Sequence, residues 1–221
     1  MKIRAAFSSL LFLLYFAVIT VTSSLAQNSL YDNGPINGTG DAWAIGAGLS
    51  VEDTFVISSP SGSATINGLS FGAWLAAGDT LQSAEVSITS QPLGGTTYFD
   101  EGVNFTGSNC TPNSIYEICQ ETGSFNGPTL NNGLYWLNLQ NAVTSEGNLV
   151  WWDANDGVGC NSPGCPSEAM ANGQGTIPSE SFTLLGTNGE TGTTPEPGSV
   201  MLFGTGVAGL LAIARRRLDR P

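Results

Sequence analysis

Short stretches in which every second residue is apolar dominate the middle of the chain. Because successive side chains of a β-strand point to opposite faces, this period of two predicts strands with one buried face. The stretches run from Val51 to Ile57, Leu69 to Leu75, Ala84 to Ile88, Tyr135 to Leu139, Leu149 to Asp153 and Phe182 to Leu184. Gly-, Pro- and Asn-rich segments at 59–62, 92–95 and 131–133 separate them as turns. No amphipathic helix of useful length competes with this pattern.

These stretches predict an all-β domain over residues 27–185. With about eight to ten short strands, the expected architecture is an antiparallel two-layer β-sandwich that is jelly-roll-like. A parallel α/β fold is excluded because the crossover helices are missing. A barrel stays open as an alternative. A polar linker at 186–194 follows the domain.

The charges are divided between the ends and the middle of the chain. All six Lys and Arg residues lie near the two ends, and the chain has no His. Of eighteen Asp and Glu residues, Glu196 and Asp219 belong to the tail, which leaves sixteen between Gln27 and Thr194. The middle part therefore carries a formal charge of −16 without a basic partner. Nucleic acids are bound through Lys and Arg, so we expect no nucleic-acid partner.

The same composition argues against catalysis. A Ser-His-Asp triad needs a His and a Ser-Lys dyad needs a Lys, and the middle part has neither. Carboxylate pairs of the kind that glycosidases use remain at Asp153 with Asp156 and at Asp100 with Glu101. Neighbouring acids on exposed loops are usually solvated, so we predict a protein that is not an enzyme.

The first 26 residues have the three parts of a secretory signal peptide. Lys2 and Arg4 precede an apolar run from Leu10 to Val21, and small residues follow up to Ala26. This predicts export by the Sec machinery and removal of 1–26 by signal peptidase. An uncleaved anchor helix is the alternative, although the apolar run is short for a membrane span.

Export places the four cysteines in an oxidising compartment, where disulfides are stable. Their spacing favours local pairs, Cys110 with Cys119 and Cys160 with Cys165, among the pairings that exist in principle. A metal site is the alternative, but the Cys-x-x-Cys pairs and the His residues that zinc sites usually contain are missing.

The C-terminal segment is apolar from 198 to 214, and Arg215, Arg216 and Arg217 follow directly. This predicts a transmembrane helix whose arginines stay in the cytoplasm. On these physical grounds alone an ordinary C-terminal anchor is equally acceptable.

A more specific interpretation comes from the order of the parts. Pro195, Glu196 and Pro197, the apolar helix and the basic cluster at 195–221 resemble the PEP-CTERM sorting signal of Gram-negative bacteria. The resemblance implies that an exosortase recognises the Pro-Glu-Pro motif and cuts nearby. The precursor would be tethered transiently to the inner membrane, and the domain would pass to the cell surface or extracellular matrix. Such proteins often occur in bacteria that make exopolysaccharide.

Two groups of residues in the middle part are candidates for ligand binding. Trp136, Trp151 and Trp152 could stack on sugar rings if they are exposed, and burial in the core is the alternative. Adjacent residues of a strand face opposite sides, so one of Trp151 and Trp152 can belong to the core while the other is exposed or is buried beneath the disulfide loop. Trp43 and Trp74 are expected in the core.

The second group, Asp153, Asn155 and Asp156, is rich in oxygen atoms and resembles a calcium loop. A simple Asx-turn is the competing interpretation.

Together these features predict a non-catalytic surface or matrix protein associated with exopolysaccharide. The alternative is a carbohydrate-binding module that uses exposed Trp, Asp and Asn side chains. Neither hypothesis needs a cofactor, although calcium would fit the second.

Overall fold

The computed structural model describes residues 27–38, 41–92 and 94–189. The predicted signal peptide at 1–26 and the sorting signal at 195–221, including its membrane helix, lie outside the described residues. Within the part of the chain that is described, no helix is long and apolar enough to cross a membrane.

The described residues form β-strands that all pair with antiparallel neighbours, which confirms the all-β, antiparallel class. The strands are β1 (Asn28–Asp32), β2 (Ala42–Ala44), β3 (Ser50–Ile57), β4 (Ser63–Ala76), β5 (Leu81–Gln91), β6 (Gly94–Asn113), β7 (Tyr116–Ser124), β8 (Thr129–Asn131), β9 (Gly133–Thr144), β10 (Trp151–Asp153), β11 (Ala169–Ala171), β12 (Gly175–Ile177) and β13 (Phe182–Asn188). Their order in the sheet is β1-β13-β4-β7-β6-β5-β9-β3-β11-β12, with β8 and β10 paired to β4 and β2 paired to β10.

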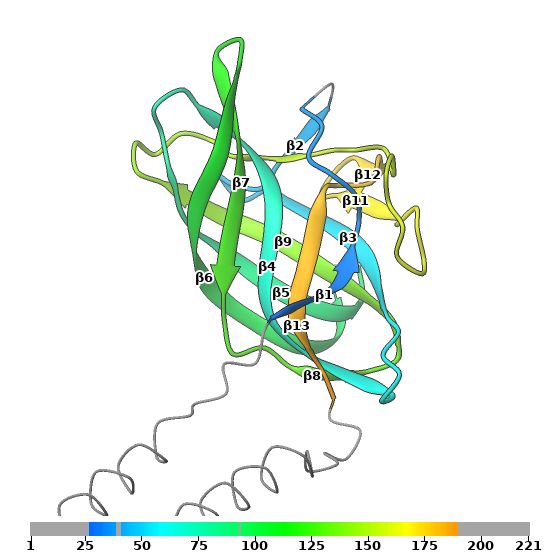
Figure 1. The fold of residues 1–221 in the computed structure, drawn as a ribbon. Helices are drawn as coiled ribbons and strands as arrows, with labels where there is room; N and C mark the ends of the chain where they lie inside the picture. Colours follow the sequence, from blue (N-terminus) through cyan, green and yellow to red (C-terminus); the bar gives the residue numbers. More distant parts are fainter. Residues whose placement is uncertain (1–26, 39–40, 93, 190–221) are drawn as a thin grey trace, which may run out of the picture.

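The long strand β6 joins the two halves of this sheet (Figure 1). Its first part, up to Asn104, pairs with β5, and its second part, from Phe105 onward, pairs with β7. Gly102 and Gly107 flank this change of partner, which suits a strand that bends there. The result is one curled sheet, in place of the two separate layers of the predicted jelly-roll-like sandwich. It lies between that sandwich and the barrel that the sequence left open.

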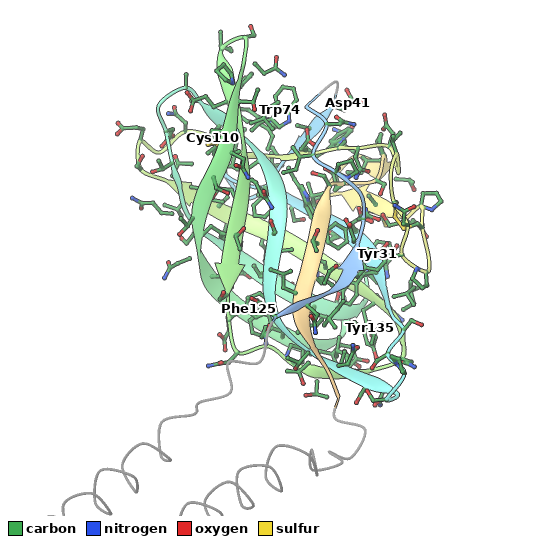
Figure 2. The ribbon with its side chains drawn as sticks, viewed as in Figure 1. Tyr31, Asp41, Trp74, Cys110, Phe125 and Tyr135 are labelled. Carbon is green, nitrogen blue, oxygen red and sulfur yellow. A yellow bond between two sulfur atoms is a disulfide. The ribbon has the colours of Figure 1, made fainter. Side chains whose placement is uncertain are left out.

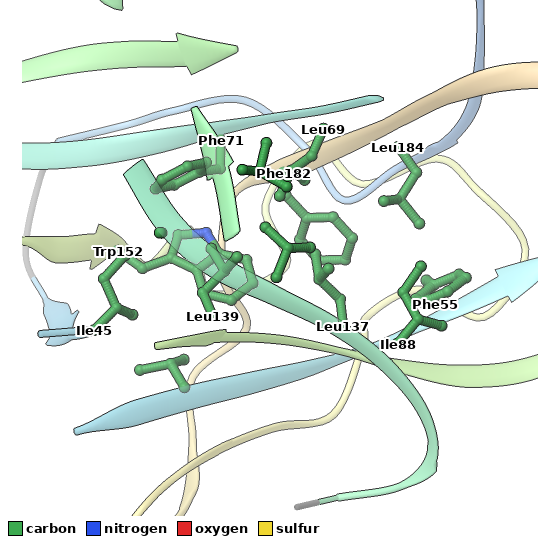
Figure 3. Packing of buried hydrophobic residues seen from close by; sticks show 14 of the residues in the cluster. Ile45, Phe55, Leu69, Phe71, Ile88, Leu137, Leu139, Trp152, Phe182 and Leu184 are labelled. Atoms are coloured by element: carbon green, nitrogen blue, oxygen red, sulfur yellow. The ribbon is translucent and has the colours of Figure 1, made fainter. Parts of the chain in front are cut away.

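The core lies inside the curl and contains the side chains that the alternating pattern assigned to one face in 51–57, 69–75 and 84–88. In 149–153 the pattern was wrong, because the core side chains are Val150 and Trp152, whereas Leu149 and Trp151 are only partly buried. Figure 3 shows Phe71, Trp152 and Phe182 packed together between the two halves of the sheet. The Trp152 ring lies 6.0 Å from the Phe71 ring and 5.6 Å from the Phe182 ring, measured between centroids. Full burial of a side chain of this size contributes roughly 1.5–3 kcal/mol to folding.

Strand β13 continues beyond the predicted end of the domain. Gly186, Thr187 and Asn188 pair with Ile66, Thr65 and Ala64 of β4, so the beginning of the predicted linker is part of the sheet. Backbone pairing with β4 explains how a polar segment can extend the strand.

The two ends of the domain lie close together. Asn28 of β1 pairs directly with Gly186 of β13, so both described ends leave from one region of the sheet. Figure 1 shows the turn between β6 and β7 toward the opposite end of the molecule.

Both predicted disulfides are present. Cys110 and Cys119 join β6 to β7 with their Cα atoms 4.0 Å apart, and Cys160 and Cys165 close an irregular loop with a separation of 5.9 Å. The described cysteines are thus all paired within their own local segments.

Candidate functional site

An open groove runs along the outer face of β4, β7 and β13. It consists of two clefts of about 490 and 400 Å³ that share Ile36 and Gln120. The polar side chains along it come from Asn37, Ser70, Asn109, Asn113, Gln120 and Thr183. Asp32 is the one charged side chain among the residues that line the two clefts. The groove is therefore dominated by neutral donors and acceptors of hydrogen bonds.

The floor of the groove is a connected set of amides and hydroxyls. Gln120 Nε2 donates to Ser70 Oγ at 3.0 Å, and Asn109 Nδ2 donates to Gln120 Oε1 at 3.1 Å. Thr122 Oγ1 also donates to Ser70 Oγ, at 3.3 Å. These bonds fix the orientation of Gln120 at the place where the two clefts meet.

The wall of the groove is the segment 34–38, and Asp153 holds it in place. The Asp153 carboxylate accepts hydrogen bonds from the backbone N–H groups of Asn37 and Gly38, at 3.0 and 3.2 Å. It also accepts from Trp74 Nε1 at 2.7 Å and from Ser181 Oγ at 3.3 Å. Asp153 is fully buried, so these donors are the ones that satisfy its charge.

The wall approaches the sheet closely because β4 has a glycine beneath it. A Cβ atom on Gly72 would lie 2.9 Å from Ile36 Cγ1 and 2.8 Å from Asp153 Cβ. A larger residue at this position would push the wall away from the sheet. At its other end the wall is tied to β6, because Asn113 Nδ2 donates to the Gly38 carbonyl at 2.9 Å.

A half-buried group of aromatic rings adjoins the hairpin end of the groove. Tyr116 lies 6.0 Å from the ring of Trp74 and 5.1 Å from that of Trp151. Trp74, which was expected in the core, instead lies partly exposed on the outer face, because its neighbours Ala73 and Leu75 take the core-facing positions of β4. Figure 2 shows Trp74 toward the hairpin end and Phe125 toward the other end.

The three tryptophans predicted as ligand residues are not brought together. Trp152 is fully buried and donates its indole N–H to the Ser181 carbonyl at 2.9 Å, and Trp136 is also buried. Trp151 remains partly exposed. Trp152 and Trp136 are thus not accessible to a sugar, while Trp151 lies beside Tyr116.

The residues predicted as a calcium loop have separate roles. Asn155 Oδ1 accepts a hydrogen bond from the Gly157 N–H at 2.9 Å, which is an Asx-turn, and Asp153 faces the groove wall. Asp156 is exposed. Within the described part of the chain, no group of three or more Asp, Glu, Cys or His side chains is arranged to hold a metal ion.

The acidic pairs considered for glycoside hydrolysis are also separated from the groove. Asp100 interacts with Glu85 in an open depression on β5 and β6, and burial followed by the Glu85 charge raises the pKa of Asp100. Hydrogen bonds from Asn141 and Gln140 lower the pKa of Glu85. Asp153 is enclosed by its hydrogen-bond donors, whereas Asp156 is exposed.

Sequence reasoning missed the groove. Its wall comes from an irregular segment without an apolar period, and the floor from polar outward-facing residues that any exposed strand could carry. The contact of Asn37 with Asp153 bridges more than a hundred positions and is not a local pattern.

The described residues form an all-β domain with a groove of mostly neutral polar side chains, and the C-terminal tail carries a recognisable motif. Residues 193–217 match the PEP-CTERM protein-sorting motif. The sorting signal predicted from the sequence is thereby confirmed, and it implies an exported protein with a membrane-anchored precursor that an exosortase processes. No curated protein matches the chain.

Proposed function

We propose that the mature domain is a non-catalytic protein of the cell surface or extracellular matrix that binds exopolysaccharide along the groove. The observation that carries this proposal is the continuous row of amide and hydroxyl groups across the two clefts. Sugar hydroxyls both donate and accept hydrogen bonds, and side-chain amides do the same. An elongated groove that is open at its ends suits a polymer better than a small molecule.

The negative charge of the domain restricts which polysaccharides it can bind. Sixteen acidic residues and no basic ones lie between Gln27 and Thr194. A strongly anionic polysaccharide would be repelled, so the preferred ligand is a neutral or cationic chain. Raising the ionic strength should therefore improve binding of an anionic polymer and change binding of a neutral one little.

A second candidate function is a carbohydrate-binding module of the stacking type. The partial exposure of Trp151 beside Tyr116 favours it. These rings adjoin the groove, so a sugar bound in the groove could also contact them. Structural calcium at Asp153, Asn155 and Asp156 is less favoured, because Asp153 and Asn155 already accept hydrogen bonds from protein donors.

Binding to purified exopolysaccharide of the producing strain tests the proposal. Gln120→Ala should weaken binding about tenfold, since one hydrogen bond is lost and the floor network loses its centre. Gln140→Ala is the matched control, because Gln140 is a half-buried amide on β9, bonded to Glu85 and distant from the groove in the sheet order. Equal affinities of the two variants for the polysaccharide would contradict binding in the groove. A loss of affinity that occurs only in Trp151→Ala would favour the carbohydrate-binding module of the stacking type.

A further inference from the structure

Two buried acidic side chains meet where β3 comes near the segment that precedes β13. Asp53 and Glu180 are both fully buried. Asp53 Oδ2 accepts hydrogen bonds from the Glu180 backbone N–H at 2.7 Å and from Asn33 Nδ2 at 3.2 Å. The two residues are 127 positions apart in sequence, so the fold itself creates this pair.

Three carboxyl oxygens of this pair have no partner. Both side-chain oxygens of Glu180 and Oδ1 of Asp53 are buried without a hydrogen bond. Burying a polar atom without a partner costs free energy, and native proteins rarely leave such atoms unsatisfied. Because the charge of Asp53 acts on the Glu180 carboxyl, these unsatisfied oxygens lie near one another, and they indicate that a group from outside the chain belongs there.

The surrounding charges indicate that this group is a cation. Burial raises the pKa of Glu180 well above its ordinary value, and the charges of Asp53, Asp153, Asp156 and Asp41 raise it further. The sequence between Gln27 and Thr194 offers no Lys, Arg or His as a countercharge. A proton neutralises one carboxyl group, but its O–H then needs an acceptor, and the remaining unpartnered carbonyl oxygens still lack a donor.

We propose that Asp53 and Glu180 bind a divalent cation, Ca²⁺, through the three oxygens that lack protein partners. Ca²⁺ takes six to eight oxygen ligands and readily combines carboxylates with neutral oxygens and water. Neutral oxygens are close by, because the hydroxyls of Ser167 and Ser179 both lie 2.7 Å from the Asn33 amide that bonds Asp53. Two carboxylates supplemented in this way need no third acidic ligand.

The expected affinity is modest. Extracellular calcium modules have dissociation constants of about 0.1–1 mM, which suits a site with two carboxylates. At about 5 mM CaCl₂ such binding should raise the melting temperature of the full chain by roughly 3–7 °C relative to EDTA.

Thermal unfolding of the full chain in detergent, with CaCl₂ or with EDTA, tests the site in two variants. Glu180→Gln should lose the shift in melting temperature. Glu121→Gln should keep it, because Glu121 is also a buried carboxyl with an unpartnered oxygen but lies on β7. The two variants have equal net charge, so diffuse screening affects them alike.

A full shift in Glu180→Gln, or no shift in the unaltered chain, would overturn the proposal. Should Glu180→Gln fail to fold, equilibrium dialysis of the unaltered chain at high ionic strength decides the question. One bound Ca²⁺ per chain supports the site, and none contradicts it. These outcomes are independent of polysaccharide binding in the groove.

Discussion

Asp153→Ala is expected to lower the free energy of unfolding by about 4 kcal/mol and to abolish binding in the groove. The substitution leaves the N–H groups of Asn37 and Gly38 and the indole N–H of Trp74 without their acceptor. Each buried donor without a partner costs about 1–3 kcal/mol, and the wall at 34–38 loses its anchor. Urea denaturation at pH 7 measures the loss.

The free energy of unfolding of Asp153→Asn should lie between those of Asp153→Ala and the unaltered protein. The asparagine keeps one acceptor oxygen, but its NH₂ group faces donors that then lack an acceptor. Asp156→Asn is the matched control, an exposed acid three positions further on, in the loop that follows β10. It should change the free energy of unfolding by less than about 0.5 kcal/mol. An Asp153→Ala variant within about 1 kcal/mol of the unaltered protein would show that the wall does not depend on this carboxylate.

Glu121→Gln is expected to stabilise the domain by about 3 kcal/mol at pH 8 and by little at pH 4. Glu121 is buried on β7 between Phe71 of β4 and Gly107 of β6, and burial raises the pKa of its carboxyl to about 7. The unfolded chain has its ordinary value near 4.5. The folded state therefore holds a proton that the unfolded state releases between these two pH values.

The direction of the pH dependence of stability follows from the difference between the folded and unfolded pKa values of Glu121. The contribution of Glu121 to stability is fully present below about pH 4.5 and is lost as the pH rises through about 7. The glutamine variant cannot ionise and so avoids the loss. Urea unfolding at pH 4 and pH 8 in the presence of EDTA measures the gain in the free energy of unfolding. The variant Glu101→Gln, at an exposed position, is the control. A gain of equal size at pH 4 and pH 8 would assign the effect to packing instead of ionisation.

The sequence predicted the parts of the fold that depend on local patterns. The alternation in 51–57 and 69–75 placed Val51, Phe55 and Phe71 in the core, because period two is a property of each strand alone. The disulfides were equally local, since each closes a short loop.

The curl of the sheet and the groove could not be predicted in this way. The curl depends on β6 changing its partner halfway along its length, which no short window contains. Trp74 was misplaced because its apolar character suggests burial, although the alternation in 69–75 that puts Ala73 and Leu75 in the core already turns Trp74 to the other face. Asp53 belongs to the pattern of β3 and Glu180 precedes β13, so the pair becomes visible only in the folded chain.

Asn28 lies beside Gly186, so the two described ends of the domain lie together. The wall of the groove is tied to β6 through Asn113, near the hairpin end away from them.

Intact mass spectrometry of the protein recovered from the cell surface tests delivery by the sorting signal most directly. Processing at both ends predicts a chain that begins at Gln27 and ends near Pro195. A surface form that retains Arg215, Arg216 and Arg217 would contradict exosortase processing and would make the tail an ordinary membrane anchor.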